Sequence, residues 1–444
     1  MSSPPHPGRE GDRGATITSS GCKRCRLAPK EVERPWDSLA EDLLELIGWL
    51  VLAGDLLDYV RFRAVCSHWN KSTLRPQGRG LVDPRFHPRR WMMFPEGHGL
   101  YPGHPKLGGY VRFFSLSTGT FVRVHLPLFD DHVVLESVDG LLLLYRNHDT
   151  AIRLLHPFTG DIAELPPLMS VLPQLERYRY MSEDRKLREL RFYLRGVCAA
   201  VTVSAAGGIT VMLSLDTRRR IAHATAGDLL WVLSPYKLPC VLVPTMSFQG
   251  KLYALSPNPR GENIVLIWQI DPPQPTTEAS HSLSLQPARI IVECPLVATM
   301  GTVHLVECRS EVFLIGFNDT SYAHLVVYRL ADLIIGRVVP ITNIGEHALF
   351  LGQRALCVSS NKGFPSVMGN TITCNDRLPI YNRQGVQDPR PIEHYHLCSA
   401  TWSLAIPQEK PPVSPHTLIH HIFTCCYRSH WNKAHMFHGR ISPD

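Results

Sequence analysis

The chain has 444 residues, of which 44% are hydrophobic and 19% charged, and its formal net charge is +7. This balance is that of a globular protein and excludes disorder along the whole chain. A net charge this small does not by itself indicate nucleic-acid binding, because nucleic-acid-binding domains usually carry a concentrated basic stripe. Because no stretch reaches the roughly 20 apolar residues of a membrane span and the first residues lack the apolar core of a signal peptide, we expect an intracellular protein of the nucleus or cytoplasm, without a nucleic-acid or membrane partner.

The first 35 residues are rich in Pro, Gly, Ser and Arg and show neither a helical nor a strand period. We therefore predict a disordered leader over residues 1–35. Cys22 and Cys25 form a lone C-x-x-C within it. A structural zinc site needs four ligands and no second pair follows at finger spacing, so we assign no metal there.

Residues 36–75 predict two or three short amphipathic helices. Ser38 and Glu41 fit a Ser-x-x-Glu capping box, which places the start of the first helix at Leu39. Gly54 ends that helix, and Asp55 caps the next one through its side chain. The apolar stripe of the first helix consists of Leu43, Leu44, Ile47, Leu50 and Val51.

This segment has a recognisable order of residues. Ser-Leu-x-x-Asp-Leu-Leu-x-x-Ile begins at residue 38, and Arg-Phe-Arg-Ala-Val-Cys-x-x-Trp begins at residue 61. The order resembles the F-box of plant F-box proteins, in which the motif binds the Skp-type adaptor of a cullin-RING ubiquitin ligase. One departure is Ala40, where the family usually has Pro. The resemblance implies adaptor contacts, some of them shared with the core of the motif itself, from Leu39, Asp42, Leu43, Leu44, Ile47, Val65, Cys66 and Trp69.

From about residue 80 the pattern changes to short apolar runs separated by tight turns, which is typical of β-structure. The clearest unit has strands at Val133–Val138, Leu141–Tyr145, Ile152–Leu155 and Ile162–Leu165. Looser copies carry strands at Ile209–Leu213, Leu252–Leu255, Val312–Ile315 and Thr371–Thr373. Four strands in each repeat predict a β-propeller of about six blades, with five to seven possible. A β-sandwich is the alternative, but five or six repeats over roughly 300 residues exceed its usual size.

Several turns of this region follow a second family pattern. An Asp139-Gly140 pair precedes the leucine-rich strand, a His-Pro-Phe-Thr-Gly turn begins at His156, a Leu-Pro-Pro exit begins at Leu165, and Leu-Phe-Leu-Gly begins at Leu349. The region resembles plant F-box proteins whose C-terminal half is a KIB-type β-propeller, with His156 in place of the family's Asn. The resemblance covers residues 80–405. The predicted fold is thus an α+β multidomain protein, a small helical F-box followed by an all-β propeller.

Two further segments stand outside the repeats. Residues 174–195 carry Leu187, Leu190 and Leu194 at near-helical spacing and predict a helical insertion on one rim. Its charges are of mixed sign, which favours a solvated helix over an RNA or membrane contact.

Residues 406–444 read as a Pro-rich linker and a disordered tail. Its His and Cys residues do not follow the spacing of a zinc module, so we assign no metal.

The sequence contains no G-x-S-x-G elbow, Walker A motif or H-E-x-x-H, so we predict no catalytic activity and no cofactor. Our hypothesis is the substrate receptor of an SCF-type ubiquitin ligase, with the propeller binding an unknown target protein. Two alternatives stay open. One is a propeller scaffold without a ligase, and the other is a small-molecule enzyme or sensor, which as a glycosidase requires two carboxylates about 5–9 Å apart in a deep pocket.

Overall fold

The computed structural model describes residues 35–94, 96, 100–175, 181–194, 197–215, 219–239, 241–242, 245–275, 283–299, 301–360, 366–374, 392–405 and 418–426. The predicted disordered leader, apart from residue 35, lies outside the described residues, as do residues 406–417 and 427–444 of the predicted tail. None of the helices in the described part of the chain has the length and apolar character that crossing a membrane requires.

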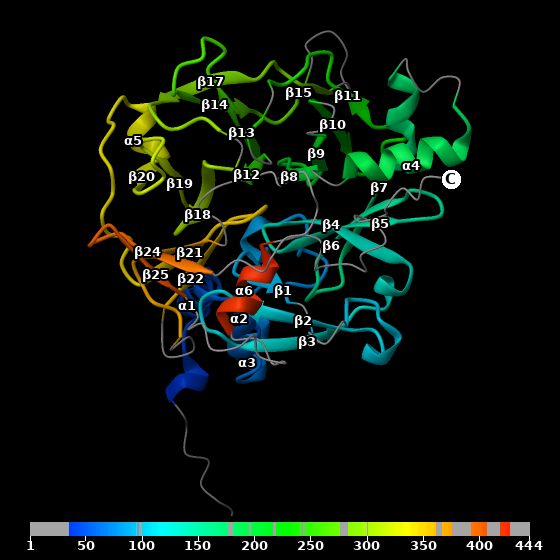
Figure 1. Cartoon of the computed structure of the whole chain (residues 1–444). Helices are drawn as coiled ribbons and strands as arrows, with labels where there is room; N and C mark the ends of the chain where they lie inside the picture. Colours follow the sequence, from blue (N-terminus) through cyan, green and yellow to red (C-terminus); the bar gives the residue numbers. More distant parts are fainter. Residues whose placement is uncertain are drawn as a thin grey trace, which may run out of the picture.

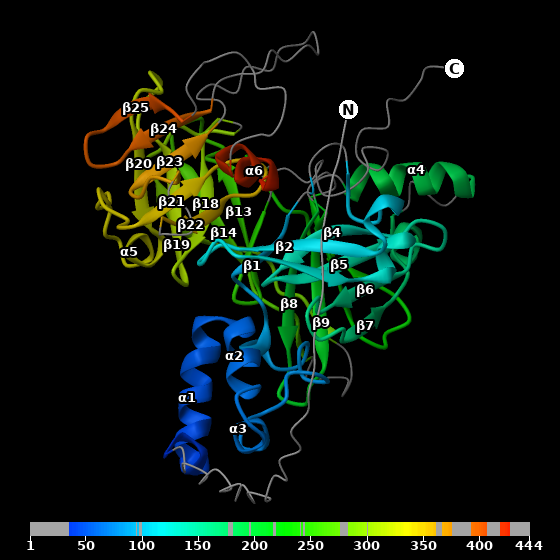
Figure 2. The same cartoon turned by 90° about the horizontal axis from the view of Figure 1, so that it is seen from below.

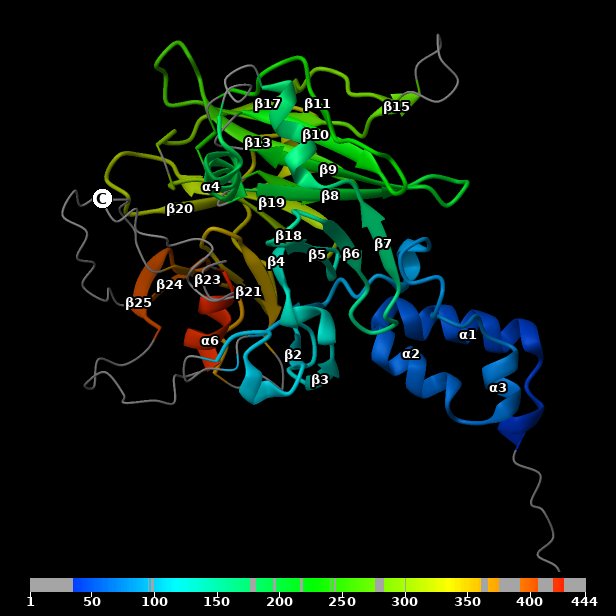
Figure 3. The ribbon, with the colours of Figure 1, turned by 90° about the vertical axis from the view of Figure 1, so that its right-hand side faces the viewer.

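An N-terminal helical unit follows a 3-10 turn, η1 (Pro35–Ser38), and stands beside the rest of the molecule in Figures 2 and 3. It contains α1 (Glu41–Gly54), α2 (Leu56–Arg63) and α3 (Ser67–Lys71). The prediction that the first helix starts at Leu39 was wrong. Ser38 belongs to the preceding 3-10 turn, so α1 begins two residues later behind Ala40, which makes no side-chain cap.

The predicted cap of the second helix is confirmed. Asp55 stands at the N-cap of α2, and its carboxylate accepts hydrogen bonds from the backbone N–H groups of Leu57 at 2.8 Å and Asp58 at 3.3 Å. Two of the four unpaired donors at the start of this helix are thereby satisfied. Asp55 therefore connects the two helices, since its carboxylate caps α2 while its backbone N–H donates to the carbonyl oxygen of Val51 at the end of α1.

Six sheets of three to five strands surround a common centre in the described residues, which makes a six-bladed β-propeller (Figure 1). Blade 1 contains β1 (Trp91–Met93), β2 (Tyr110–Ser115) and β3 (Phe121–His125). Blade 2 contains β4 (His132–Val138), β5 (Leu141–Arg146), β6 (Ile152–Leu155) and β7 (Ile162–Leu165). Blade 3 contains β8 (Val197–Val203), β9 (Ile209–Leu215), β10 (Arg220–Thr225) and β11 (Val232–Leu233). Blade 4 contains β12 (Met246–Phe248), β13 (Lys251–Pro257), β14 (Val265–Ile270) and β17 (Arg289–Cys294).

Blade 5 contains β18 (His304–Cys308), β19 (Glu311–Phe317) and β20 (Leu325–Arg329), followed by the short helix α5 (Leu330–Ile334). Blade 6 contains β21 (His347–Phe350), β22 (Leu356–Ser359), β23 (Thr371–Cys374), β24 (Glu393–His396) and β25 (Thr401–Leu404). Its β21 pairs in parallel with β23, so this blade departs from a plain antiparallel meander. A small hairpin of β15 (Gln274–Pro275) and β16 (Leu283–Ser284) extends from blade 4.

Blade 2 shows why these runs form strands that are covered on both faces. The turn residues Asp139 and Gly140 have φ of 51° and 82°, the left-handed pair that a two-residue hairpin turn requires. Leu141 to Leu144 are fully buried in β5, so the leucine run needs no polar side. The four strands predicted for this blade are confirmed in order and position.

Clusters of buried apolar side chains join each blade to the next around the ring. The last cluster joins blade 6 to blade 1 and includes a helix, α6 (Leu418–Cys425). Ile419, Ile422 and Phe423 of α6 lie on one helix face and are buried between the two blades. The predicted disorder of the tail is thus wrong for residues 418–426, because their apolar side chains fill the seam where the ring closes.

A second helix, α4 (Glu183–Tyr193), lies within the segment where we predicted an insertion. It follows a 3-10 helix, η5 (Leu168–Gln174), and lies at the edge of the ring between blades 2 and 3 (Figures 1 and 3). Leu190 and Leu194 are buried in the cluster that these two blades share. The segment is therefore packed along one side and contributes to the core of the propeller.

Candidate functional site

Helix α1 carries apolar side chains on two opposite faces. Leu44, Gly48 and Leu52 are buried on the inner face. Leu43, Leu46 and Leu50 follow one another at three- and four-residue steps on the outer face, with exposed fractions of 47%, 57% and 67%. We call these three leucines the outer stripe. A soluble helix normally turns polar residues to water, so this stripe is an exposed apolar surface of the helical unit, in which Trp36 and Val65 are exposed as well.

The inner face of α1 is in close contact with its neighbours, which fixes the orientation of the outer stripe. A side-chain carbon placed at Gly48 would lie 3.3 Å from both Tyr59 and Thr73. Tyr59 is buried and donates a hydrogen bond from its hydroxyl to the carbonyl oxygen of Leu74 at 2.8 Å. The helix cannot turn about its axis without breaking this packing, and the leucines of the outer stripe stay in solvent.

The chain before α1 is held against α3. The indole N–H of Trp69 donates to the carbonyl oxygen of Trp36 at 3.0 Å, and the Nε2 atom of His68 lies 2.9 Å from the carbonyl oxygen of Leu39. The rings of Trp69 and Phe62 contact each other with centroids 4.5 Å apart. The start of α1 and the last helix of the unit therefore belong to one structured surface.

The eight predicted adaptor residues occupy three kinds of position. Asp42, Leu43 and Val65 are exposed, while Leu39, Ile47, Cys66 and Trp69 are half-buried. Leu44 is fully buried and belongs to the core of the unit, so it has no surface to offer a partner. The predicted set missed Leu46 and Leu50, although their helical spacing from Leu43 is a signal that the sequence contains.

The helical unit is attached to the propeller by hydrogen bonds of Asp55, His156 and Asp161, and we call this set of contacts the joint. The second oxygen of the Asp55 carboxylate accepts a hydrogen bond from the indole N–H of Trp91 in β1 at 2.8 Å, and both side chains are buried. Burial raises the pKa of the Asp55 carboxyl, and the hydrogen bonds from Leu57, Asp58 and Trp91 oppose that rise. One side chain thus caps a helix of the unit and binds the first strand of the propeller.

The connecting segment between the unit and β1 is held by a turn of blade 2. The carboxylate of Asp161 accepts hydrogen bonds from the backbone N–H groups of Gly78 and Gly80 at 2.8–3.0 Å. The Nε2 atom of His156 lies 3.0 Å from the carbonyl oxygen of Phe86, and Phe86 packs against Tyr59 of the unit. Blade 2 therefore binds the connecting segment, and the connecting segment packs against the helical unit.

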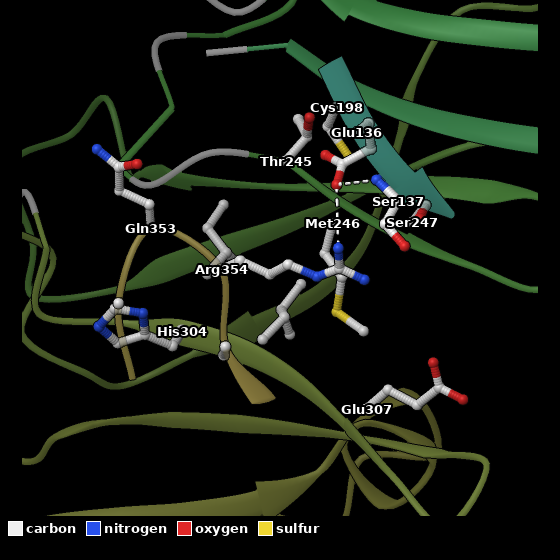
Figure 4. A pocket seen from close by; sticks show the side chains of 14 residues that line it. Glu136, Ser137, Cys198, Thr245, Met246, Ser247, His304, Glu307, Gln353 and Arg354 are labelled. Atoms are coloured by element: carbon white, nitrogen blue, oxygen red, sulfur yellow. Dashed lines mark hydrogen bonds and ion pairs between the residues drawn. The ribbon is translucent and has the colours of Figure 1, made fainter. Parts of the chain in front are cut away.

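The centre of the propeller contains a pocket of about 110 Å³, seen from close by in Figure 4. Its lining comes from the inner strands of several blades and from the loop before β22, and includes Glu136, Thr245, His304, Glu307 and Arg354. A volume of this size is smaller than the roughly 300–1,000 Å³ of ordinary ligand sites and accommodates only a few water molecules.

The pocket has one internal ion pair. The guanidinium of Arg354 lies 3.2 Å from the carboxylate of Glu136, which also accepts the backbone N–H of Ser137 at 2.9 Å (Figure 4). The register shift of β4 between Val134 and Glu136 is a bulge, a device that redirects side chains. Glu307 lies on another side, and burial raises the pKa of its carboxyl. The pocket thus holds a paired carboxylate and one that burial disfavours as an ion.

One family model and several solved structures are similar to this chain. No curated protein matches this sequence. The chain is similar to the β-propeller domain of Myceliophteria thermophila Cps50 (Swd1), with 9% identity and a TM-score of 0.23 over 50% of this chain and 80% of that one. It is also similar to extracellular domains 1-2 of Drosophila Semaphorin 1b, with 8% identity and a TM-score of 0.19 over 47% of this chain and 56% of that one.

A further similarity is to Drosophila Plexin A in complex with Semaphorin 1b, with 10% identity and a TM-score of 0.20 over 67% of this chain and 62% of that one. Scores this low say nothing about function. The family model of the KIB1-4 beta-propeller, in contrast, matches residues 113–396, which run from β2 in blade 1 to β24 in blade 6. The match covers well over half of the chain, and the protein belongs to the KIB1-4 beta-propeller family.

Proposed function

We propose that this protein is the substrate receptor of an SCF-type ubiquitin ligase, in which the helical unit acts as an F-box for a Skp-type adaptor and the propeller holds a target protein. The observation that carries the proposal is the outer stripe of α1, three exposed leucines on a helix whose other face is already packed. The F-box-like order of residues around it supports a Skp-type adaptor as the partner. The compartment that fits is the nucleus or cytoplasm, where such ligases work.

The size of the outer stripe suits a specific contact. Burying a whole leucine side chain is worth about 1.5–3 kcal/mol, and each of these three is roughly half exposed. Together they offer about 3–5 kcal/mol of association free energy before any polar contact is counted. Asp42 is exposed in the first turn of the same helix, so the surface combines an apolar centre with a charged edge.

The joint supports the same proposal because a receptor has to hold its target at a fixed place. Asp55, Trp91 and Asp161 connect the helices to blades 1 and 2 through buried or partly buried hydrogen bonds. A rigid connection raises the effective concentration of a bound target near the enzyme that modifies it. In this function the chain makes and breaks no covalent bond itself.

The test is co-purification of the full chain with a Skp-type adaptor. The variant Leu46→Asp/Leu50→Asp places two charges on the outer stripe without touching the core, and we expect adaptor recovery to fall by at least tenfold. Leu229→Asp is the matched control, because Leu229 is 87% exposed on the propeller. Circular dichroism checks that each variant is folded. Wild-type recovery with the double variant would remove the basis of the proposal.

Ala40 allows a second measurement in the opposite direction. Its φ of −60° is the value that proline fixes, and the related F-boxes usually have Pro here. We therefore expect Ala40→Pro to leave the helix intact and to keep or strengthen adaptor binding. A loss of binding in a folded Ala40→Pro variant would show that this unit does not use its first turn as an F-box does.

The propeller is also consistent with a protein-interaction scaffold that has no ligase. The same variants separate the two functions, since a scaffold would bind its partners unchanged by charges on the outer stripe and would recover no adaptor in the wild type. The small central pocket, with its Glu136–Arg354 ion pair, gives the enzyme alternative less support.

A further inference from the structure

Three metal-binding side chains meet at the seam between blades 5 and 6. Cys308 ends β18, while His347 and Cys357 lie on the neighbouring strands β21 and β22. Their potential ligand atoms all lie within 4.8 Å of one another, and the two sulfur atoms are 2.9 Å apart. No other group of three or more such side chains this close occurs in the part of the chain that the structure describes. We call these three residues the seam cluster.

The histidine of the seam cluster is incompletely bonded. His347 is 7% exposed, and its Nδ1 atom lies 3.2 Å from the hydroxyl of Ser359. Its Nε2 atom is buried and has no hydrogen-bond partner among the described residues. A buried polar nitrogen without a partner carries a free-energy cost. Coordination by one of the ring nitrogens, with a hydrogen bond at the other, is the usual state of a metal-binding histidine.

We propose that Cys308, His347 and Cys357 bind one thiophilic d10 metal ion, either Zn²⁺ or Cu(I), through the two sulfur atoms and an imidazole nitrogen. Thiolate and imidazole ligands together select these ions over Mg²⁺ or Ca²⁺. Each cysteine loses its thiol proton to solvent as its sulfur binds the ion, so two protons are released for each ion bound. Neither the ion nor the protein changes oxidation state.

The geometry requires only a small adjustment. With metal–sulfur bonds of about 2.3 Å and tetrahedral angles, two sulfur ligands lie about 3.8 Å apart, so the Cys308–Cys357 pair has to open by less than about 1 Å. Cys308 and Cys357 belong to different blades. A bound ion therefore links blade 5 to blade 6 and stabilises the ring by binding the folded state alone.

A disulfide between the two cysteines is the competing chemistry for the same atoms. It needs an oxidant, and it leaves the Nε2 atom of His347 without a partner. Mass spectrometry and alkylation distinguish the two chemistries. A disulfide lowers the mass of the chain by two hydrogen atoms and protects both cysteines from alkylation without any bound ion.

The test uses the full chain, purified under reducing conditions, stripped with a chelator and then loaded with Zn²⁺ or Cu(I) alone. We expect Cys308→Ala and His347→Gln to bind one ion fewer for each chain than the wild type does. Cys294→Ala is the matched control, since Cys294 is a fully buried thiol of blade 4 outside the seam cluster, and it should bind as the wild type does. The ion should raise the thermal midpoint by a few degrees in the wild type and the control only.

Cobalt provides a measurement that does not depend on the folding of a variant. Co²⁺ bound to the wild type at the seam cluster should give the thiolate-to-cobalt charge-transfer absorption expected for two sulfur ligands, and competition with Zn²⁺ or Cu(I) shows which ion binds more tightly. The proposal is overturned if the wild type gives no such band, if Cys308→Ala binds as many ions as the wild type, or if the chain purified without a reductant carries the disulfide and no ion.

Discussion

Asp55 allows the joint between the helical unit and the propeller to be tested by one residue. Its carboxylate caps α2 through one oxygen and accepts the indole N–H of Trp91 through the other. Losing the cap costs about 1 kcal/mol, and leaving the buried indole donor without a partner costs about 1–3 kcal/mol. Asp55→Ala should therefore lower the free energy of unfolding by about 2–4 kcal/mol.

Asp55→Asn separates the two roles. An asparagine caps a helix about as well as an aspartate, but once its carbonyl oxygen faces Leu57 its amide group presents a donor to Trp91. We expect a cost of about 1–3 kcal/mol in the wild-type background and a much smaller cost beside Trp91→Phe, where the donor is absent. Urea unfolding followed by tryptophan fluorescence measures all four proteins. Equal costs in the two backgrounds would mean that the Asp55–Trp91 bond does not stabilise the joint.

Three further predictions concern single positions. Gly80→Ala should cost about 1–3 kcal/mol in a urea titration, since its new carbon would lie 2.6 Å from the Thr159 hydroxyl, whereas Gly54→Ala, with open space around it, should not destabilise the protein. Burial lowers the pKa of His394 to about 4, so unfolding takes up a proton between pH 6.5 and 4. Stability should fall by roughly 3 kcal/mol as the pH is lowered through that window, and His394→Gln should lack this part of the slope in urea titrations at several pH values. Ser310 has a φ of 63° in the β18–β19 turn, so Ser310→Gly should raise the urea midpoint by the equivalent of about 0.5–1 kcal/mol, and a lowered midpoint would contradict the strain argument.

The blades could be predicted from the sequence because their signals are local. Asp139 and Gly140 between two apolar runs specify both strands and the turn that pairs them. Helix α6 had no such signal. Its apolar residues Ile419, Ile422 and Phe423 form a short run among histidines and cysteines, and the surface that buries them belongs to blades 1 and 6, which are distant in the sequence.

The candidate site could be predicted only in part, for two physical reasons. Helix α1 is apolar on both faces, and periodicity alone does not say which face packs inward, so Leu44 and Leu43 were placed on one stripe although the first is in the core and the second in solvent. The seam cluster follows no spacing rule at all. Cys308 and His347 are distant in the sequence and meet only because two blades pack side by side.

His156 illustrates how a departure from the family pattern is accommodated at the joint. Its Nδ1 atom accepts hydrogen bonds from the backbone N–H groups of Phe158 and Thr159, as the side-chain oxygen of the usual Asn can in a turn. The proton must then be on Nε2, which donates to the carbonyl oxygen of Phe86. Burial lowers the pKa of this imidazole and keeps it neutral, as this arrangement requires. The histidine thus orders its own turn and binds the segment that leads from the helical unit to β1, so this one side chain helps to fix the distance between the outer stripe and the propeller.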